Sequence, residues 1–208
     1  MKKGIVLSCI AMILVPSAAA LADITTGTWN LDQSNTYADG VNYGTVAISA
    51  NDVSGVVSFA VDALTAPYTN GIGTDFGLQK FGFNFSGTSS MNSWVLPNGW
   101  NPGTNVSFDG FGEFEVATKT TGGFRQDPLN FSFTLSTASQ ALATNFEVTN
   151  GGGAQGNWFF AAHVAGFNIL NGDESHYIGG NAVVPAPAGV ILCGLGLGLV
   201  RLVKRRFA

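Results

Sequence analysis

The 208-residue chain has few charged residues, and cations are almost absent away from its two ends. Charged residues make up 11% of the chain, whereas about a quarter is usual for a globular protein. From Asp23 to Glu174 there are thirteen acidic residues but only three cations, which gives this region a formal charge of −10. A nucleic-acid partner is excluded, because binding to phosphate groups requires a basic face.

Cysteine and catalytic motifs are equally scarce. Cys9 and Cys193 are the only cysteines, and neither lies in the middle region, so a disulfide framework is excluded. That region must be held together by its hydrophobic core, alone or with bound ions. There is no Gly-x-Ser-x-Gly sequence and no phosphate-binding glycine loop, and thirteen acids make carboxylate pairs too easy to propose. We therefore predict no catalytic residues and no enzyme activity; a secreted hydrolase is the least favoured alternative.

The first 22 residues have the pattern of a signal peptide. Lys2 and Lys3 begin it, an apolar run from Ile5 to Val15 follows, and Ala20-Leu21-Ala22 provides a cleavage site before Asp23. The alternative, a first transmembrane helix, requires about 20 apolar residues, and this run is shorter. The pattern predicts export through the inner membrane.

The C-terminal end consists of three parts. Two prolines make the segment 183–187 an extended linker. The apolar run from Val183 to Val200 reaches spanning length if Leu202 and Val203 join it. The basic cluster that ends the chain places the C-terminus in the cytoplasm by the positive-inside rule. We predict a single transmembrane helix with a basic cytoplasmic end over residues 188–208.

This tail resembles the PEP-CTERM sorting signal of Gram-negative bacteria. Ala186 stands where that family usually has glutamate, and the resemblance is carried by a Gly/Leu-rich helix together with Val184, Pro185, Pro187, Arg205 and Arg206. The resemblance implies processing by an exosortase, a transpeptidase-like membrane enzyme. It also implies brief anchoring in the inner membrane, release to the cell surface or extracellular matrix, and association with exopolysaccharide in a biofilm. The alternative is a plain single-pass anchor that is never cleaved.

The middle region, residues 23–182, alternates between apolar and polar residues with period two, as strands with one buried face do. The clearest cases are Val57–Val61, Phe81–Phe85 and Leu129–Leu135. The other expected elements are one short helix at Thr137–Thr144 and strands at Thr28–Leu31, Tyr43–Ser49, Glu113–Ala117, Asn145–Thr149, Trp158–Phe167 and Tyr177–Val183. About nine strands joined by polar turns predict an all-β outer domain, an antiparallel β-sandwich or jelly-roll-like fold. Trp158–Phe167 is apolar on both faces and is predicted to be a central strand.

Two tryptophans are the candidate ligand-binding residues. Trp94 and Trp100 bracket a segment with Pro and Gly, where two indoles can form a stacking platform for sugars. The preferred alternative is that both cap an edge of the sandwich. A carbohydrate-binding module is therefore the second functional hypothesis, after an exported, non-enzymatic surface or matrix protein.

Two acidic segments are candidate metal sites, and calcium is the ion that suits such oxygen ligands. Asp109 and Glu113 lie close together at a turn, and Asp173, Glu174 and His176 lie close together in a predicted polar loop. The spacing at Asp109 and Glu113 matches no EF-hand, and ordinary solvated surface is the preferred explanation of both segments. We therefore predict no cofactor, with calcium as the alternative.

Overall fold

The computed structural model describes residues 23–68, 71–120, 123–149, 151–167 and 175–184. The predicted signal peptide (1–22) and the residues of the predicted sorting tail from Pro185 onward, including Pro187, Arg205 and Arg206, lie outside the described residues, as do Asp173 and Glu174.

No helix among the described residues is both long enough and apolar enough to cross a membrane.

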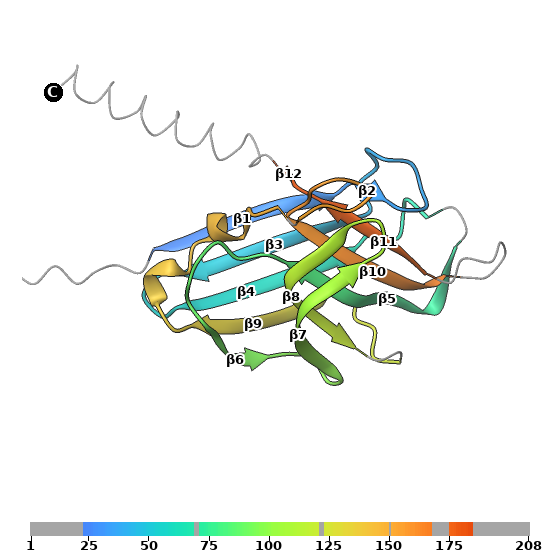
Figure 1. Cartoon of the computed structure of the whole chain (residues 1–208). Coiled ribbons are helices and arrows are strands. Elements are labelled where there is room, and N and C mark those ends of the chain that lie inside the picture. Colours follow the sequence, from blue (N-terminus) through green and yellow to red (C-terminus); the bar gives the residue numbers. More distant parts are fainter. Residues whose placement is uncertain (1–22, 69–70, 121–122, 150, 168–174, 185–208) are drawn as a thin grey trace, which may run out of the picture.

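Twelve strands form two six-stranded sheets in the described part of the chain, and each paired strand is antiparallel to its neighbours (Figure 1). Sheet A has the order β12-β1-β3-β4-β9-β6 and consists of Ala182–Val183 (β12), Ile24–Leu31 (β1), Gly44–Asn51 (β3), Val56–Ala63 (β4), Leu129–Leu135 (β9) and Met91–Val95 (β6). Sheet B has the order β2-β11-β10-β5-β8-β7 and consists of Gln33–Ser34 (β2), Ser175–Gly180 (β11), Phe160–Phe167 (β10), Ile72–Phe83 (β5), Gly112–Thr120 (β8) and Trp100–Phe108 (β7). The all-β prediction is confirmed.

The period-two alternation of the sequence matches the alternation of buried and exposed residues in strands of sheet A. In β4, Val57, Phe59 and Val61 are buried, whereas Ser58 and Ala60 between them are exposed. β9 begins and ends where the pattern predicts and buries its alternate apolar residues in the same way. Because successive side chains of a strand point to opposite faces, each strand adds apolar groups to the core and small polar groups to the outer face.

The inner faces of the two sheets share one aromatic core. Phe59 of β4 stacks on Phe131 of the neighbouring β9, and its ring centroid lies 4.8 Å from that of Phe83 of β5 in the other sheet. On the far side of the core, Trp29 of β1 meets Phe160 of β10 at 5.2 Å. Aromatic pairs at such distances add stabilisation beyond the area that they bury, so these rings hold the two sheets face to face.

The predicted central strand is confirmed, and one predicted strand is wrong. β10 lies between β11 and β5, and both of its faces are largely buried. The predicted strand at Asn145–Thr149 does not form, because the chain there ends a 3-10 turn at Ala143–Phe146 (η2) whose Phe146 is buried against Phe59. The helix predicted at Thr137–Thr144 is two short 3-10 turns, of which the first covers Ala138–Gln140 (η1).

The alternation pattern did not reveal β6 and β7. β6 has a bulge, so its alternation is broken, and β7 contains Pro102 and Gly103, which favour a loop in a sequence-based reading. Both are edge strands, β6 of sheet A and β7 of sheet B. Proline is tolerated at an edge, because its missing N–H removes no bond inside the sheet.

The all-β domain also extends further than predicted. β12 pairs with β1 through Ala182 and Val183, and the backbone N–H of Val184 donates a hydrogen bond to the carbonyl of Thr28 at 2.8 Å. Val183 therefore belongs to sheet A, and Val184 is hydrogen-bonded to β1, where a separate linker was predicted.

Candidate functional site

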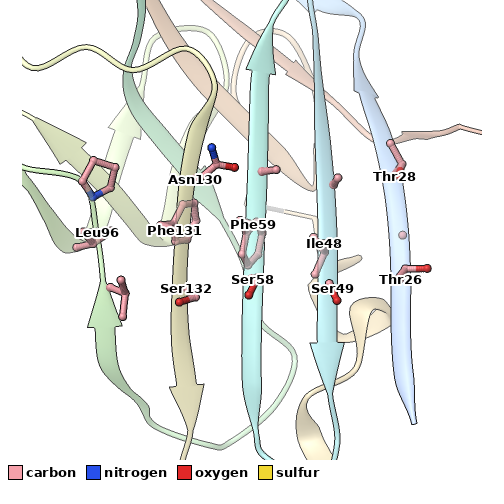
Figure 2. Close-up of a pocket in the computed structure, with 15 residues that line it drawn as sticks. Thr26, Thr28, Ile48, Ser49, Ser58, Phe59, Leu96, Asn130, Phe131 and Ser132 are labelled. Carbon is pink, nitrogen blue, oxygen red and sulfur yellow. The ribbon is translucent and has the colours of Figure 1, made fainter. Parts of the chain in front are cut away.

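The outer face of sheet A, called the open face below, carries a line of hydroxyl groups across four strands. The antiparallel register places Thr26 opposite Ser49, Ser49 opposite Ser58, and Ser58 opposite Ser132. We call these four residues the hydroxyl row; Figure 2 shows them side by side at one level of the sheet. Neighbouring strands lie about 4.8 Å apart, so the row is about 14 Å long.

A second row of small residues runs parallel to the hydroxyl row, two positions along each strand. It consists of Thr28, Ala47, Ala60 and Asn130. The two rows form the floor of a hollow of about 710 Å³, which Val95, Leu96 and Pro97 also line. Figure 2 shows Leu96 at one side of it. Small side chains in the middle of the sheet and a larger apolar segment at its edge therefore make the hollow.

The chemistry of the hollow is polar but uncharged. No residue that lines it is Asp, Glu, Lys, Arg or His. None of the four side-chain oxygens of the hydroxyl row has a hydrogen-bond partner among the residues that the structure describes. Each hydroxyl can donate one hydrogen bond and accept two, and the amide of Asn130 can do both. The open face therefore offers donors and acceptors that the fold itself leaves unused.

The outer face of sheet B differs, because part of it is covered by the chain itself. The hairpin formed by β7 and β8 carries Phe108, Phe111 and Phe114 near its turn; we call these three buried rings the phenylalanine cap. A Cβ placed on Gly82 of β5 would lie 2.6 Å from the ring of Phe108, and Gly179 of β11 faces the ring of Phe111 in the same way. The cap thus packs directly on backbone, which only glycine permits here.

The structure separates the two candidate sugar-binding tryptophans. The ring of Trp100 is buried, only 4% exposed, and its indole N–H donates a hydrogen bond to the carbonyl of Phe124 at 2.7 Å. The predicted platform of two exposed indoles is therefore wrong. A ring inside the core cannot stack on a ligand, and the carbonyl of Phe124 satisfies the N–H that would otherwise face water.

Trp94 remains partly exposed, in a cleft at the open edge between the two sheets. Its ring lies 4.7 Å from Phe133, and a bulge at Ser93, whose φ is 52°, turns Trp94 inward while Val95 points outward. The cleft has a volume of about 500 Å³, and Phe85, Met91, Trp94, Pro102, Glu115 and Val116 are among the residues that line it. It is a second, smaller candidate site, with one aromatic ring instead of two.

The predicted metal ligand His176 lies on β11 and not in a polar loop. Its side chain is only 1% exposed and is surrounded by the rings of Tyr37, Tyr43, Tyr68 and Phe167. Neither ring nitrogen has a hydrogen-bond partner in the described part of the chain. The other two residues of this candidate metal site, Asp173 and Glu174, lie outside the described residues, so a metal site at His176 stays a prediction; among the described residues its ring is surrounded by aromatic carbon.

The other acidic candidates make ordinary surface contacts. Asp109 accepts a hydrogen bond from the amide of Asn35 at 3.1 Å, and Glu113 accepts one from the hydroxyl of Ser107 at 3.3 Å. Within the described ranges, no three His, Cys, Asp or Glu side chains come together in a way that could hold a metal ion. The calcium alternative therefore has no ligand set at Asp109 and Glu113 in the described part of the chain.

Sequence reasoning missed the hydroxyl row, although the alternation of β4 and β9 already shows which residues point outward. What the sequence does not show is the strand order and register that place Ser58 between Ser49 and Ser132. Residues 49 and 132 are far apart in the chain, so only the pairing of β3, β4 and β9 brings them to one row.

Comparison of the chain with models of known protein families, with curated proteins and with solved structures gives no match.

Proposed function

We propose that this protein is an exported, non-enzymatic surface or matrix protein that holds a neutral polysaccharide chain on the open face of sheet A. The observation that carries the proposal is the uncharged hollow of about 710 Å³, with the hydroxyl row and Asn130 on its floor. Their unused donors and acceptors are what a ligand rich in hydroxyl groups requires.

The charge of the hollow supports a neutral glycan. The domain has thirteen acids, yet among the outward-facing residues of the strands in sheet A only Asp62 at the end of β4 is charged. A charged ligand would lose its hydration in the hollow without gaining a partner of opposite charge. The apolar rim at Val95, which is 66% exposed, and Pro97 offers contact to the C–H surface of a sugar ring.

The lining also supports binding over hydrolysis. Glycoside hydrolysis requires an acid and a second carboxylate on either side of the scissile bond. The residues around the hollow include neither a carboxylate nor a histidine. A glycan held here would meet no general acid.

The C-terminal tail supports the part of the proposal that concerns export and processing. The last described residue, Val184, lies at the edge of sheet A beside Thr28, and the residues that resemble the PEP-CTERM signal follow it in sequence. We propose that residues 1–22 are removed on export, that 188–208 anchor the chain briefly in the inner membrane, and that an exosortase cuts near Pro187. The β-sandwich outer domain then passes to the cell surface or biofilm matrix.

Binding on the open face is tested by filling the hollow without changing its charge. Ser58→Tyr places a large side chain in the centre of the hydroxyl row, and Thr45→Tyr places the same side chain on the same face outside the hollow. In affinity electrophoresis through neutral exopolysaccharide from the host, Ser58→Tyr should weaken retardation about tenfold or more, a loss of about 1.4 kcal/mol. Thr45→Tyr should behave as wild type. Equal retardation of all three proteins would reject the site. So would a wild-type protein that is not retarded at all.

Processing of the tail is tested separately, by intact-mass measurement of the protein released from the cell surface. The proposal expects a mass that ends near Pro187 and lacks residues 1–22. A released form that still contains residues 188–208 would contradict cleavage by an exosortase. It would favour the alternative, a plain single-pass anchor that is never cleaved. Deletion of the host exosortase should then keep the protein in the membrane fraction.

The edge cleft supports a second candidate function, a carbohydrate-binding module that uses Trp94. The observation in its favour is that Trp94 lines a partly apolar cleft of about 500 Å³ with the carboxylate of Glu115 at its rim. A sugar that stacks on Trp94 would change its fluorescence, and Trp94→Phe would remove that signal. If retardation of the protein depends on Trp94 and not on Ser58, the cleft is the binding site and the open face is not.

A further inference from the structure

Lys80 and Lys119, two of the three cations between Asp23 and Glu174, lie on the outer face of sheet B, next to the phenylalanine cap. The antiparallel register places His163 of β10 opposite Lys80 of β5, and Lys80 opposite Lys119 of β8. Tyr177 of β11 and Asn101 of β7 continue the same line at its two ends. We call these five residues the basic row; it crosses five strands on the side of the domain opposite the open face.

This gathering is unexpected in so acidic a domain. The region from Asp23 to Glu174 has thirteen acids for three cations, so an average lysine should find a carboxylate nearby. Among the described residues the only ion pair joins Arg125 and Asp75, at 2.9 Å. Lys80 and Lys119 thus have no carboxylate within ion-pair distance in the described structure, although acids outnumber them several times.

The two lysines face each other at a cost to stability. Like charges directly opposite on neighbouring strands are destabilising, and the Cα atoms of such a pair lie only about 5 Å apart. Burial, followed by the charge of Lys119, lowers the pKa of Lys80 below its usual value. Local conflicts of this kind are expected at functional sites.

The rest of the row can hold a ring-shaped ligand beside these charges. The rings of His163 and Tyr177 are stacked, 4.4 Å apart and inclined by 16°, and both are partly exposed. The Nζ atom of Lys80 lies 5.5 Å from the centroid of the Tyr177 ring and donates a hydrogen bond to the carbonyl of Ser107. Asn101, which is exposed, adds an amide beside Lys119. Two partly exposed rings, two ammonium groups and an amide therefore lie in one line.

We propose that the basic row binds carboxylate groups of an acidic polysaccharide, with Lys80 and Lys119 on one carboxylate and the stacked His163 and Tyr177 against the neighbouring sugar ring. An ammonium–carboxylate hydrogen bond is about twice as strong as one between neutral groups. The acids elsewhere in the domain oppose such a ligand only weakly, because charges beyond the Debye length of about 8 Å are screened at physiological ionic strength. The site is independent of the neutral glycan proposed for the open face.

The probe for this site is polygalacturonate, with dextran as the neutral comparison, and the protein is the purified full-length chain. Two variants lower the net charge by one unit each. Lys119→Gln removes a charge from the row, whereas Val53→Glu adds an acid in the exposed turn between β3 and β4 of the other sheet. Lys119→Arg keeps the charge in place. Urea unfolding of each variant verifies that it is folded.

Wild type should bind polygalacturonate and not dextran through this row, more weakly at about 200 mM than at about 50 mM salt. At the lower salt concentration Lys119→Gln should lose about tenfold in affinity, Val53→Glu less than about twofold, and Lys119→Arg almost nothing. Absence of polygalacturonate binding by folded wild type would overturn the proposal. Equal losses in Lys119→Gln and Val53→Glu would also overturn it, because they would show a response to net charge alone. Neither result would affect the outcome for Ser58→Tyr on the open face.

Discussion

The outer faces of the two sheets each carry a cross-strand row of small residues, but only the row on sheet B is covered by the chain itself. On sheet B, Gly82 and Gly179 have no side chain, so the phenylalanine cap packs on their backbone and a second, smaller core forms. On sheet A, the corresponding positions carry hydroxyl, methyl and amide groups, and they border a hollow that no described segment fills.

This difference shows how side-chain chemistry decides what a sheet face can bind. Glycine lets aromatic rings come close enough to exclude water, which is favourable for apolar surface. Serine and threonine hydroxyls lose water only if a new hydrogen bond replaces it. A row of hydroxyl groups therefore remains hydrated until a ligand with its own donors and acceptors arrives, whereas a row of glycines is covered during folding.

The largest effect should come from removing part of the cap. Phe111 is completely buried over Gly179, so Phe111→Ala should lower the free energy of unfolding by about 4 kcal/mol. Val95→Ala removes an apolar side chain from the rim of the open face, where it is 66% exposed, and should cost less than about 0.5 kcal/mol. Urea unfolding of both variants measures the contrast. Similar losses would show that the open face is also part of a packed core.

Larger side chains should distinguish the outer faces of the two sheets as clearly as smaller ones. Gly82→Val would force its side chain into the rings of Phe108 and Phe114 and should cost about 2 to 3 kcal/mol. Ala60→Val adds two methyl groups to an exposed position of β4 in the hollow and should change stability by less than about 0.5 kcal/mol. The midpoints of urea unfolding of the two variants measure this difference in stability. A Gly82→Val protein as stable as Ala60→Val would contradict the close packing of the cap.

The two histidines test the inner and outer sides of sheet B by their response to acid. Burial, followed by the charge of His163, lowers the pKa of His176 to about 4. The unfolded chain binds this proton near pH 6.5. The stability that the neutral, buried ring contributes is therefore fully present above about pH 6.5 and is lost as the pH falls toward 4. The loss should approach 3 kcal/mol. His176→Phe should remove most of it, as measured by urea unfolding at several pH values.

His163 is the matched control for that experiment. Its pKa is also lowered to about 4, by burial and by the charges of Lys80 and Arg125, but its ring is partly exposed on the outer face. His163→Phe should therefore flatten the acid response less than His176→Phe. Asp127 acts in the opposite direction, because burial raises its pKa to about 6, and stability from this group falls as the pH rises from about 4 to 6. An unchanged acid response in His176→Phe would show that the buried imidazole does not control it.

The smallest effect concerns the pair of lysines. Lys119→Thr removes the like charge opposite Lys80 and introduces a good strand former, so it should raise the free energy of unfolding by about 0.5 kcal/mol. The gain should shrink at high salt, which screens the repulsion. A loss of stability at low salt would mean that Lys119 has a stabilising contact and that the row carries no cost.

The sequence predicted the strands that alternate regularly and missed β2, β6 and β7, which lie at sheet edges. β4, β9 and β10 follow from their own residues, because the side-chain period of a strand is a local property. β6 and β7 could not be predicted in this way, since a bulge interrupts the pattern of β6 and a proline interrupts that of β7. Phe146, expected in a strand, packs in a 3-10 turn because tertiary burial outweighs local propensity.

The candidate sites were less predictable than the strands, for a related reason. Trp100 and His176 stood out as residue types that bind ligands, yet the fold buries both. Ser58 and Lys119 are ordinary surface residues in the sequence. They become candidates only through their neighbours across the sheet, Ser49 and Ser132 for the one and Lys80 for the other.

The sequence by itself determined the strand-forming segments, the apolar core residues and the scarcity of cations, because each of these depends on composition or on nearest neighbours along the chain. The tertiary structure alone decided which outward-facing residues share a row, which face is covered by the phenylalanine cap, and where Lys80 and Lys119 meet. These properties depend on strand order and register, which join residues far apart in sequence.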